Sequence, residues 1–420
     1  MTDQPRRLCI AWMLVLNGLL VAAAASATPQ ASGNTVIVLS WDGLRHDYVD
    51  RGNLPALQRI SREGVRAERM RSVFPSDTFP SHVSLASGTY PDVHGIVANQ
   101  FFDRELGTYW MSAETHWLQA EPLWIAAERQ GVAAATYFWV GSEQDWRGQG
   151  IRYRIAPFDG ERPEARKVEQ ILQWLNLPLQ DRPGLIMCYW RGTDHAGHRY
   201  GPNSTKVMAA LQQQDAQLDR LLQALDAQDR WGEVTLIIVS DHGMTVAGDY
   251  LPVREALAEA GIPATMLGQT VLHVFLEQVA QRDAALTTIR AVHPALEVYP
   301  GDALPARWRL QHPSRSGDLV IAAPPPFVLS RPAGFEGLVY RVFNALGWDY
   351  GGHGYDPGLA DMGASFLAMG RGVAAGERLT EVRAIDVAAT VAQLLQIDPP
   401  LQSEGVPIDL RGAAETASDN

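Results

Sequence analysis

Three apolar runs that are typical of buried strands are each followed by side chains that can bind a metal ion. The runs are VIVLS (36–40), LIMCYW (185–190) and VTLIIVS (234–240), and they resemble parallel strands covered on both faces. Since the carboxyl ends of such strands lie at one edge of a sheet, the polar residues that follow them should lie close together. These residues are Asp42, Asp194, His198, Asp241 and His242, and a further candidate, His353, lies in the glycine-rich segment 351–354.

This combination of carboxylates and imidazoles favours a metal centre. A carboxylate at the end of a buried strand is costly to desolvate unless it is paired or ligated. Asp and His ligands with open positions suit two divalent ions, and they favour zinc over manganese or iron. The chain has only 2 Cys, which excludes a cysteine-rich zinc site. Taken singly, each residue could instead cap a helix or lie in a surface loop.

Thr78, in the segment FPSDTFPSH, is the candidate nucleophile. Pro80 is expected in the first turn of a helix, which places Thr78 at the positive helix end, where backbone N–H groups favour an anion. Coordination to a dication would lower the pKa of its hydroxyl. A plain helix-capping role is the alternative. Asn99 could donate a hydrogen bond to a phosphoryl oxygen, or it could be a turn residue.

The charge of the chain limits the classes of ligand that it can bind. The 420 residues carry a formal net charge of −12, and 46% of them are hydrophobic, as in an ordinary folded protein of about two or three domain-sized units. The acidic balance argues against a surface that binds nucleic acid, so no duplex binding is expected. The acidic charge does not exclude a small phosphate ligand that is held by a metal site.

Residues 1–27 are typical of an export signal. Arg6 and Arg7 precede an apolar run at 8–24, and Ala25-Ser26-Ala27 forms a small-residue cleavage site. The sequence therefore predicts a periplasmic or secreted protein, cut after Ala27, with no stable membrane span after cleavage. An uncleaved membrane anchor is the alternative, and the export route (general or twin-arginine) stays open. Cleavage would leave Cys188 without a partner in the chain, as a buried apolar residue.

The order of elements indicates an α/β fold. Helical patterns at 121–130, 165–175 and 206–228 alternate with the strands, which predicts a mainly parallel central sheet flanked by helices. A different pattern at 250–340 indicates a small inserted α+β subdomain. The predicted catalytic core thus comprises residues 28–249 and 341–420, with a last strand at 365–369 and a last helix at 386–395.

Several longer motifs resemble the nucleotide pyrophosphatase/phosphodiesterase family of the alkaline phosphatase superfamily. They are VIVLSWDGLRHDY, FPSDTFPSHVSLASGTYPDVHGIVANQFFD, EPLWIAAERQG, ATYFWVGSE, YWRGTDHAGHRYGP, SDHGM and GGHGYD, and they come in the order found in that family. The resemblance covers nearly the whole core, and it implies an alkaline phosphatase-like fold.

The resemblance also implies two zinc ions. One would be bound by Asp194, His198 and His353. The other would be bound by Asp42, Asp241 and His242, with Thr78 as a further ligand that becomes the nucleophile. Asn99 matches the family's phosphate-binding asparagine, and Phe79 and Tyr189 match aromatic positions that hold a nucleotide base.

The activity implied by the resemblance is the hydrolysis of phosphodiester or pyrophosphate bonds of nucleotides. Thr78 would form a phospho-threonine intermediate, and nucleoside 5′-monophosphates would be released. The expected partner is a small phosphodiester or nucleotide, and no obligate protein partner is evident. A phospholipid-type or choline-headgroup phosphodiesterase, a phosphomonoesterase and a metal-stabilised binding protein without turnover are the alternatives. A sulfatase is disfavoured, because the C-x-P-x-R motif is absent.

Two positions depart from the family pattern. Asp77 lies where many nucleotide-cleaving relatives carry Lys, and an acid there should disfavour polyanionic leaving groups if it faces the site. Gly192 lies where many animal members have Glu. The physiological substrate, the base preference and the oligomeric state are not readable from the sequence.

Overall fold

The computed structural model describes residues 33–330 and 350–412. The predicted signal segment 1–27 lies outside the described residues, as does the predicted boundary at residue 340, so both stay predictions. Within the described residues, no helix combines the length and apolarity needed to cross a membrane.

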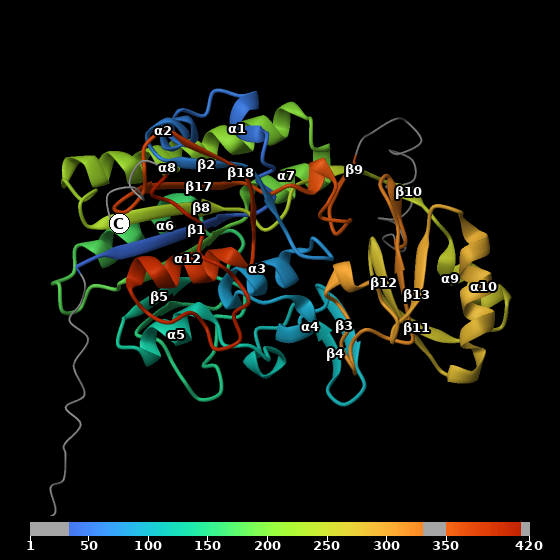
Figure 1. The fold of residues 1–420 in the computed structure, drawn as a ribbon. Coiled ribbons are helices and arrows are strands. Elements are labelled where there is room, and N and C mark those ends of the chain that lie inside the picture. Colours follow the sequence, from blue (N-terminus) through green and yellow to red (C-terminus); the bar gives the residue numbers. More distant parts are fainter. Residues whose placement is uncertain (1–32, 331–349, 413–420) are drawn as a thin grey trace, which may run out of the picture.

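The core of the protein is an eight-stranded sheet in the order β18-β2-β17-β8-β1-β7-β5-β6 (Figure 1). Its central strand pairs are parallel, and only β17 runs antiparallel to its neighbours β2 and β8. The predicted mainly parallel sheet is therefore confirmed. The strands are β1 (Thr35–Trp41), β2 (Val65–Arg71), β5 (Ala134–Tyr137), β6 (Tyr153–Ile155), β7 (Leu185–Trp190), β8 (Val234–Val239), β17 (Phe366–Gly370) and β18 (Glu377–Arg383).

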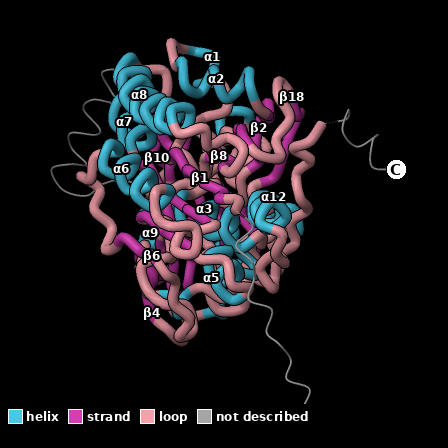
Figure 2. The backbone as a smooth tube through the Cα atoms, turned by 90° about the vertical axis from the view of Figure 1, so that its left-hand side faces the viewer, coloured by secondary structure: helices cyan, strands magenta, loops and turns pink. Residues whose placement is uncertain are grey.

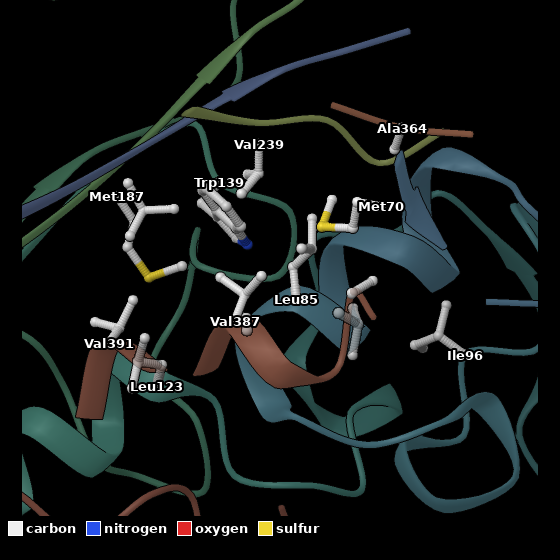
Figure 3. Close-up of a cluster of buried hydrophobic side chains, with 14 of the residues drawn as sticks. Met70, Leu85, Ile96, Leu123, Trp139, Met187, Val239, Ala364, Val387 and Val391 are labelled. Atoms are coloured by element: carbon white, nitrogen blue, oxygen red, sulfur yellow. The ribbon is translucent and has the colours of Figure 1, made fainter. Parts of the chain in front are cut away.

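Helices cover both faces of this sheet (Figures 1 and 2). Apolar residues of α2 (Pro55–Glu63), α6 (Glu164–Leu175) and α8 (Thr205–Ala227) form one hydrophobic cluster with the strands, and Cys188 is buried there as expected. The other face packs against α3 (Thr78–Ser87), α5 (Leu123–Arg129) and α12 (Asp386–Leu395). Figure 3 shows this second cluster, in which Trp139 lies between the sheet and the last helix.

The shorter elements of the core connect these layers. They are α1 (Tyr48–Arg51), α4 (Pro91–His94), the hairpin β3 (Gln100–Asp103) and β4 (Gly107–Trp110), α7 (Gly192–Tyr200), and the antiparallel pair β9 (Thr245–Ala247) and β16 (Tyr350–Gly352).

A second, antiparallel sheet lies in the stretch predicted to be an inserted subdomain. Its order is β11-β12-β14-β13, from Ala264–Gly268, Val271–Leu276, Leu319–Ala322 and Glu297–Pro300, respectively. It packs with α9 (Val253–Glu259) and α10 (Arg282–Val292) around its own hydrophobic cluster. A two-stranded pair of β10 (Asp249–Tyr250) and β15 (Phe327–Val328) lies where the chain enters and leaves this region. The predicted α/β fold with a small α+β insertion is confirmed.

A buried arginine joins the insertion to the core. Arg315 belongs to the insertion, and its Nε donates to Asp103 Oδ2 at 2.8 Å at the end of β3. Its Nη1 donates to the backbone oxygens of Gly95 and Trp117 at 2.6 and 3.0 Å. Both charged side chains are almost fully buried. Because removing one member of a buried ion pair leaves an uncompensated charge, this contact fixes the insertion against the core.

A carboxylate of α8 satisfies the N-terminus of α2. Asp215 is buried, and its two carboxylate oxygens accept hydrogen bonds from the backbone N–H groups of Ala56 and Leu57, at 3.0 and 2.8 Å. The N-cap residue of α2, Leu54, has no side chain that could do this. Asp215 thus replaces the missing cap from a distant part of the chain.

We predict that Asp215→Ala lowers the free energy of unfolding by about 1–3 kcal/mol, because two buried N–H groups lose their acceptor. Urea unfolding followed by circular dichroism measures this change. Asp219→Ala, one turn along α8, is the control, since its carboxylate bonds only a neighbouring glutamine side chain. Equal stability of the two variants would contradict the capping role.

Candidate active site

The carboxyl ends of β1 and β8 bring three predicted ligands together. Asp42 follows β1, and Asp241 and His242 follow β8, the strand that pairs with β1 in parallel. His242 Nε2 lies 3.4 Å from Asp42 Oδ1 and 3.2 Å from Asp241 Oδ2. All three side chains are buried. Gly43 allows Asp194 to approach this group, since a Cβ at position 43 would lie 3.1 Å from the Cα of Asp194.

The other predicted ligands lie next to this group. Asp194 and His198 are four residues apart on α7, and His198 Nε2 lies 3.2 Å from Asp194 Oδ1. His353 follows β16, whose pairing with β9 brings it beside His242. His353 Nε2 lies 3.1 Å from His198 Nε2 and 3.7 Å from Asp194 Oδ1.

His242 lies between the two groups, which the sequence did not indicate. Its ring stacks on that of His353, with the centroids 3.7 Å apart. Potential ligand atoms within 4.8 Å of one another fall into two sets, Asp42–Asp241–His242 and Asp194–His242–His353. His242 belongs to both sets. The six predicted side chains therefore converge, while their division between two ions stays a prediction.

The three imidazoles all present the same nitrogen to the cluster. The Nδ1 atoms of His198, His242 and His353 lie 3.0, 2.8 and 3.1 Å from the backbone oxygens of Gly351, Gly243 and Ser76, respectively. A nitrogen that faces a carbonyl oxygen carries the proton, so the Nε2 lone pairs are left for a ligand. This arrangement is usual for imidazoles that bind metals.

The carboxylates of the cluster lack the partners that buried charges require. Asp42 Oδ1, Asp194 Oδ1 and Asp241 Oδ2 are buried and accept no hydrogen bond from the described residues. Burial and the charges of Asp241 and Asp194 raise the pKa of Asp42 well above its usual value. Burial raises the pKa of Asp241 to about 7. Unpartnered oxygens and neutral imidazole nitrogens fit one or more divalent cations, which would neutralise this cluster.

Thr78 and Asn99 lie beside this cluster, at the start of α3. Thr78 is the first residue of α3, and its Oγ1 is 3.3 Å from His242 Nε2. Asn99 Oδ1 accepts a hydrogen bond from the backbone N–H of Phe79 at 2.9 Å. The amide oxygen of Asn99 is thus occupied, and its amide nitrogen is the group that can donate to a ligand.

A cavity of about 370 Å³ extends from this cluster. Asp42, Thr78, Asp194 and His198 line one part of it, and the rest combines aromatic side chains with aliphatic, polar and charged ones, among them Glu143 and Arg191. The predicted aromatic residues Phe79 and Tyr189 are both in its wall. The remaining aromatic lining residues are Phe138 and Phe158.

Tyr189 and Phe158 differ in how they meet the cavity. Tyr189 is 7% exposed, and its hydroxyl donates to Asp42 Oδ2 at 2.6 Å, which ties it to the carboxylate cluster. Phe158 is 44% exposed and lies edge to face with Tyr189. Phe158 also lies edge to face with Phe138. The sequence did not indicate Phe158, because a single Phe in a loop after β6 carries no spacing signal.

Comparison with known proteins identifies the class to which this fold and site belong. The family model described as type I phosphodiesterase/nucleotide pyrophosphatase matches residues 36–356, so the chain belongs to this family within the alkaline phosphatase superfamily. It is a hydrolase that acts on phosphodiester bonds.

Individual relatives span most of the chain. Bis(5′-adenosyl)-triphosphatase enpp4 of Xenopus laevis is 28% identical over 89% of this chain and 79% of its own length. A pyrophosphatase/phosphodiesterase of Schizosaccharomyces pombe is 29% identical over 80% of this chain and 71% of its own length. The solved structure of murine ectonucleotide pyrophosphatase/phosphodiesterase 5 has a TM-score of 0.80 at 26% identity, covering 89% of this chain and 97% of that one. An inactive form of the murine protein in complex with AMP has a TM-score of 0.81 at 25% identity, with 90% and 99% coverage.

We predict that His242→Ala releases more metal than the loss of any other single histidine, because His242 belongs to both sets of potential ligands. Zinc content after dialysis against a weak chelator, measured by mass spectrometry, tests this. His195→Ala is the matched control, because His195 is an exposed neighbour on α7 that belongs to neither set. Equal zinc content in the two variants would contradict the assignment.

Proposed function

We propose that the chain is an exported, two-zinc nucleotide pyrophosphatase/phosphodiesterase that releases nucleoside 5′-monophosphates. The observation that carries this proposal is the position of Thr78. Its hydroxyl lies against His242, within the carboxylate and imidazole cluster, and at the mouth of an aromatic cavity. Export is supported by the sequence of residues 1–27 alone.

The reaction begins with Thr78. Its Oγ1 attacks phosphorus, so that a threonine O–P bond forms and the P–O bond to the leaving group breaks. Water then cleaves the phospho-threonine and restores the hydroxyl. Bound zinc ions would lower the pKa of the attacking groups and neutralise charge on the phosphoryl oxygens. In the proposed divisions, Asp194, His198 and His353 hold one ion, and Asp42, Asp241, His242 and Thr78 hold the other.

Groups of the chain would stabilise the phosphoryl group during this attack. Thr78 begins a ten-residue helix whose first N–H groups favour negative charge. Asn99, held by its bond to Phe79 N, would donate from its amide nitrogen to a non-bridging oxygen. Such preorganised donors are a main source of catalysis in phosphoryl transfer.

The cavity supports a nucleotide as the substrate. Phe79 and Phe158 line it together, and stacking on aromatic rings holds a base with little regard to its identity. Tyr189, the other residue predicted to hold the base, lines the same cavity, and its hydroxyl is bonded to Asp42. The murine relative with bound AMP is consistent with a nucleotide in such a site.

A choline-headgroup phosphodiesterase is the second candidate. The cavity combines Phe79, Phe138, Phe158 and Tyr189 with the carboxylate of Glu143, and aromatic faces with an acid can hold a quaternary ammonium.

We predict that Thr78→Ala reduces kcat by on the order of a thousandfold or more, because the nucleophile is removed. Zinc content and the unfolding midpoint should stay close to those of the wild type. Thr78→Ser, which keeps a hydroxyl, should retain measurable turnover. Full turnover in Thr78→Ala would overturn the assignment of the nucleophile.

We predict that the metal-replete enzyme hydrolyses p-nitrophenyl thymidine 5′-monophosphate faster than p-nitrophenyl phosphate. Phe158→Ala should lower kcat/KM for the nucleotide ester roughly tenfold or more, as expected for a lost stacking contact, and should leave p-nitrophenyl phosphate unchanged. The reverse ranking of the wild-type rates would favour a phosphomonoesterase. Faster release of headgroup from glycerophosphocholine would favour the second candidate.

A further inference from the structure

Asp77 occupies the N-cap position of α3 but does not cap the helix. Its backbone is extended, with φ −104° and ψ 155°, and its side chain accepts no hydrogen bond from the first turn. An aspartate at this position usually accepts such a bond, which stabilises a helix by about 0.5–2 kcal/mol. The carboxylate lies elsewhere: Oδ1 is 3.2 Å from Nδ1 of His353.

The contact is on the outer side of the His353 ring. Nδ1 faces Asp77 Oδ1 and the backbone oxygen of Ser76, at 3.2 and 3.1 Å. Nε2, on the inner side, lies 3.1 Å from His198 Nε2 and 3.7 Å from Asp194 Oδ1. Asp77 and the backbone oxygen of Ser76 therefore both favour a proton on the nitrogen that cannot bind an ion in the cluster, which leaves the other nitrogen free to do so.

The surrounding chain leaves room for this carboxylate. Gly354 has φ +88°, and a Cβ there would lie 2.6 Å from Asp77 Oδ1 and 2.4 Å from Thr270 Oγ1. The two segments are tied together, because Gly354 N donates to Ser76 O at 2.9 Å and Ser76 Oγ donates to Tyr355 O at 2.6 Å. The side chain of Asp77 is 22% exposed, so water shields its charge only in part.

We propose that Asp77 is a positioning residue that orients His353 and makes its Nε2 a stronger ligand for a divalent metal. A carboxylate that accepts from the outer nitrogen fixes the ring and its tautomer, and it raises the basicity of the inner nitrogen. The inference rests on the metal centre of the proposed function, but not on the identity of the substrate. It also gives the acid at position 77 a use other than repulsion of polyanionic leaving groups.

The test is the affinity of the metal-free protein for Zn²⁺ alone, measured by competition with a chromophoric chelator. Asp77→Asn keeps the shape of the side chain and removes its charge. We expect zinc to bind about 10–100-fold more weakly at one site, as for the loss of other such partners. Asp145→Asn is the control for net charge, because Asp145 is an exposed residue that pairs with Arg154.

A second variant separates positioning from helix stability. Asp77→Ser supplies an N-cap side chain that is too short to reach His353, so the metal-free protein should be as stable as the wild type while zinc binds more weakly. The visible spectrum of the Co²⁺-substituted protein should change in both variants. Zinc affinities within twofold of the wild type in both would overturn the proposal. Failure of the proposed function would appear differently, as a wild type that binds zinc but hydrolyses no phosphodiester.

Discussion

Three carboxylates that lie side by side, two of them fully buried, are the constraint on which the rest of the site depends. Asp42, Asp194 and Asp241 each have an oxygen that accepts no hydrogen bond from the described residues, and burial together with neighbouring negative charge raises the pKa of Asp42 and Asp241. Such an arrangement is unstable in a low-dielectric interior unless positive charge is supplied. The imidazoles around it present lone pairs, not protons, because backbone carbonyls hold their outer nitrogens. The fold thus concentrates negative charge that a divalent cation would neutralise.

Rigid elements of the fold hold these carboxylates close together. Two of the carboxylates follow neighbouring parallel strands, and the third lies in the first turn of α7, so none depends on a long loop for its position. His353 is held by a short antiparallel pair and by the segment before α3. The nucleophile candidate Thr78 and the positioning residue Asp77 are adjacent in that segment. One stretch of chain therefore sets both the reacting hydroxyl and the orientation of a proposed ligand.

Much of the site could be predicted from the sequence, because parallel strands impose a simple rule. The apolar runs before Asp42, Asp241 and His242 predict their position, and the structure brings them together with Asp194, His198 and His353. The helix that begins at Thr78 followed from Pro80. The short or half-exposed strands β5, β6 and β18 have no such pattern and were not predicted.

Features that depend on tertiary contact could not be found in this way. The position of His242 between two groups arises from its stacking on His353, more than a hundred residues away. Phe158 and the cap supplied by Asp215 have partners that only the folded chain brings near. By its residue type and its position before α3, Asp77 would be predicted to cap the helix. Only the folded chain, which brings His353 beside it, gives Asp77 a different contact.

The residues that line the cavity all lie between positions 42 and 198, whereas several proposed ligands come from the second half of the chain. The described residues of the insertion contribute none of the cavity wall, but Thr270 donates a hydrogen bond to the backbone of His353 at 3.1 Å, and Arg315 fixes the insertion to the core. The chain order thus separates the described cavity wall from Asp241, His242 and His353, three of the proposed ligands. Substitutions in the first half of the chain can therefore change the wall of the cavity without replacing any of these three side chains.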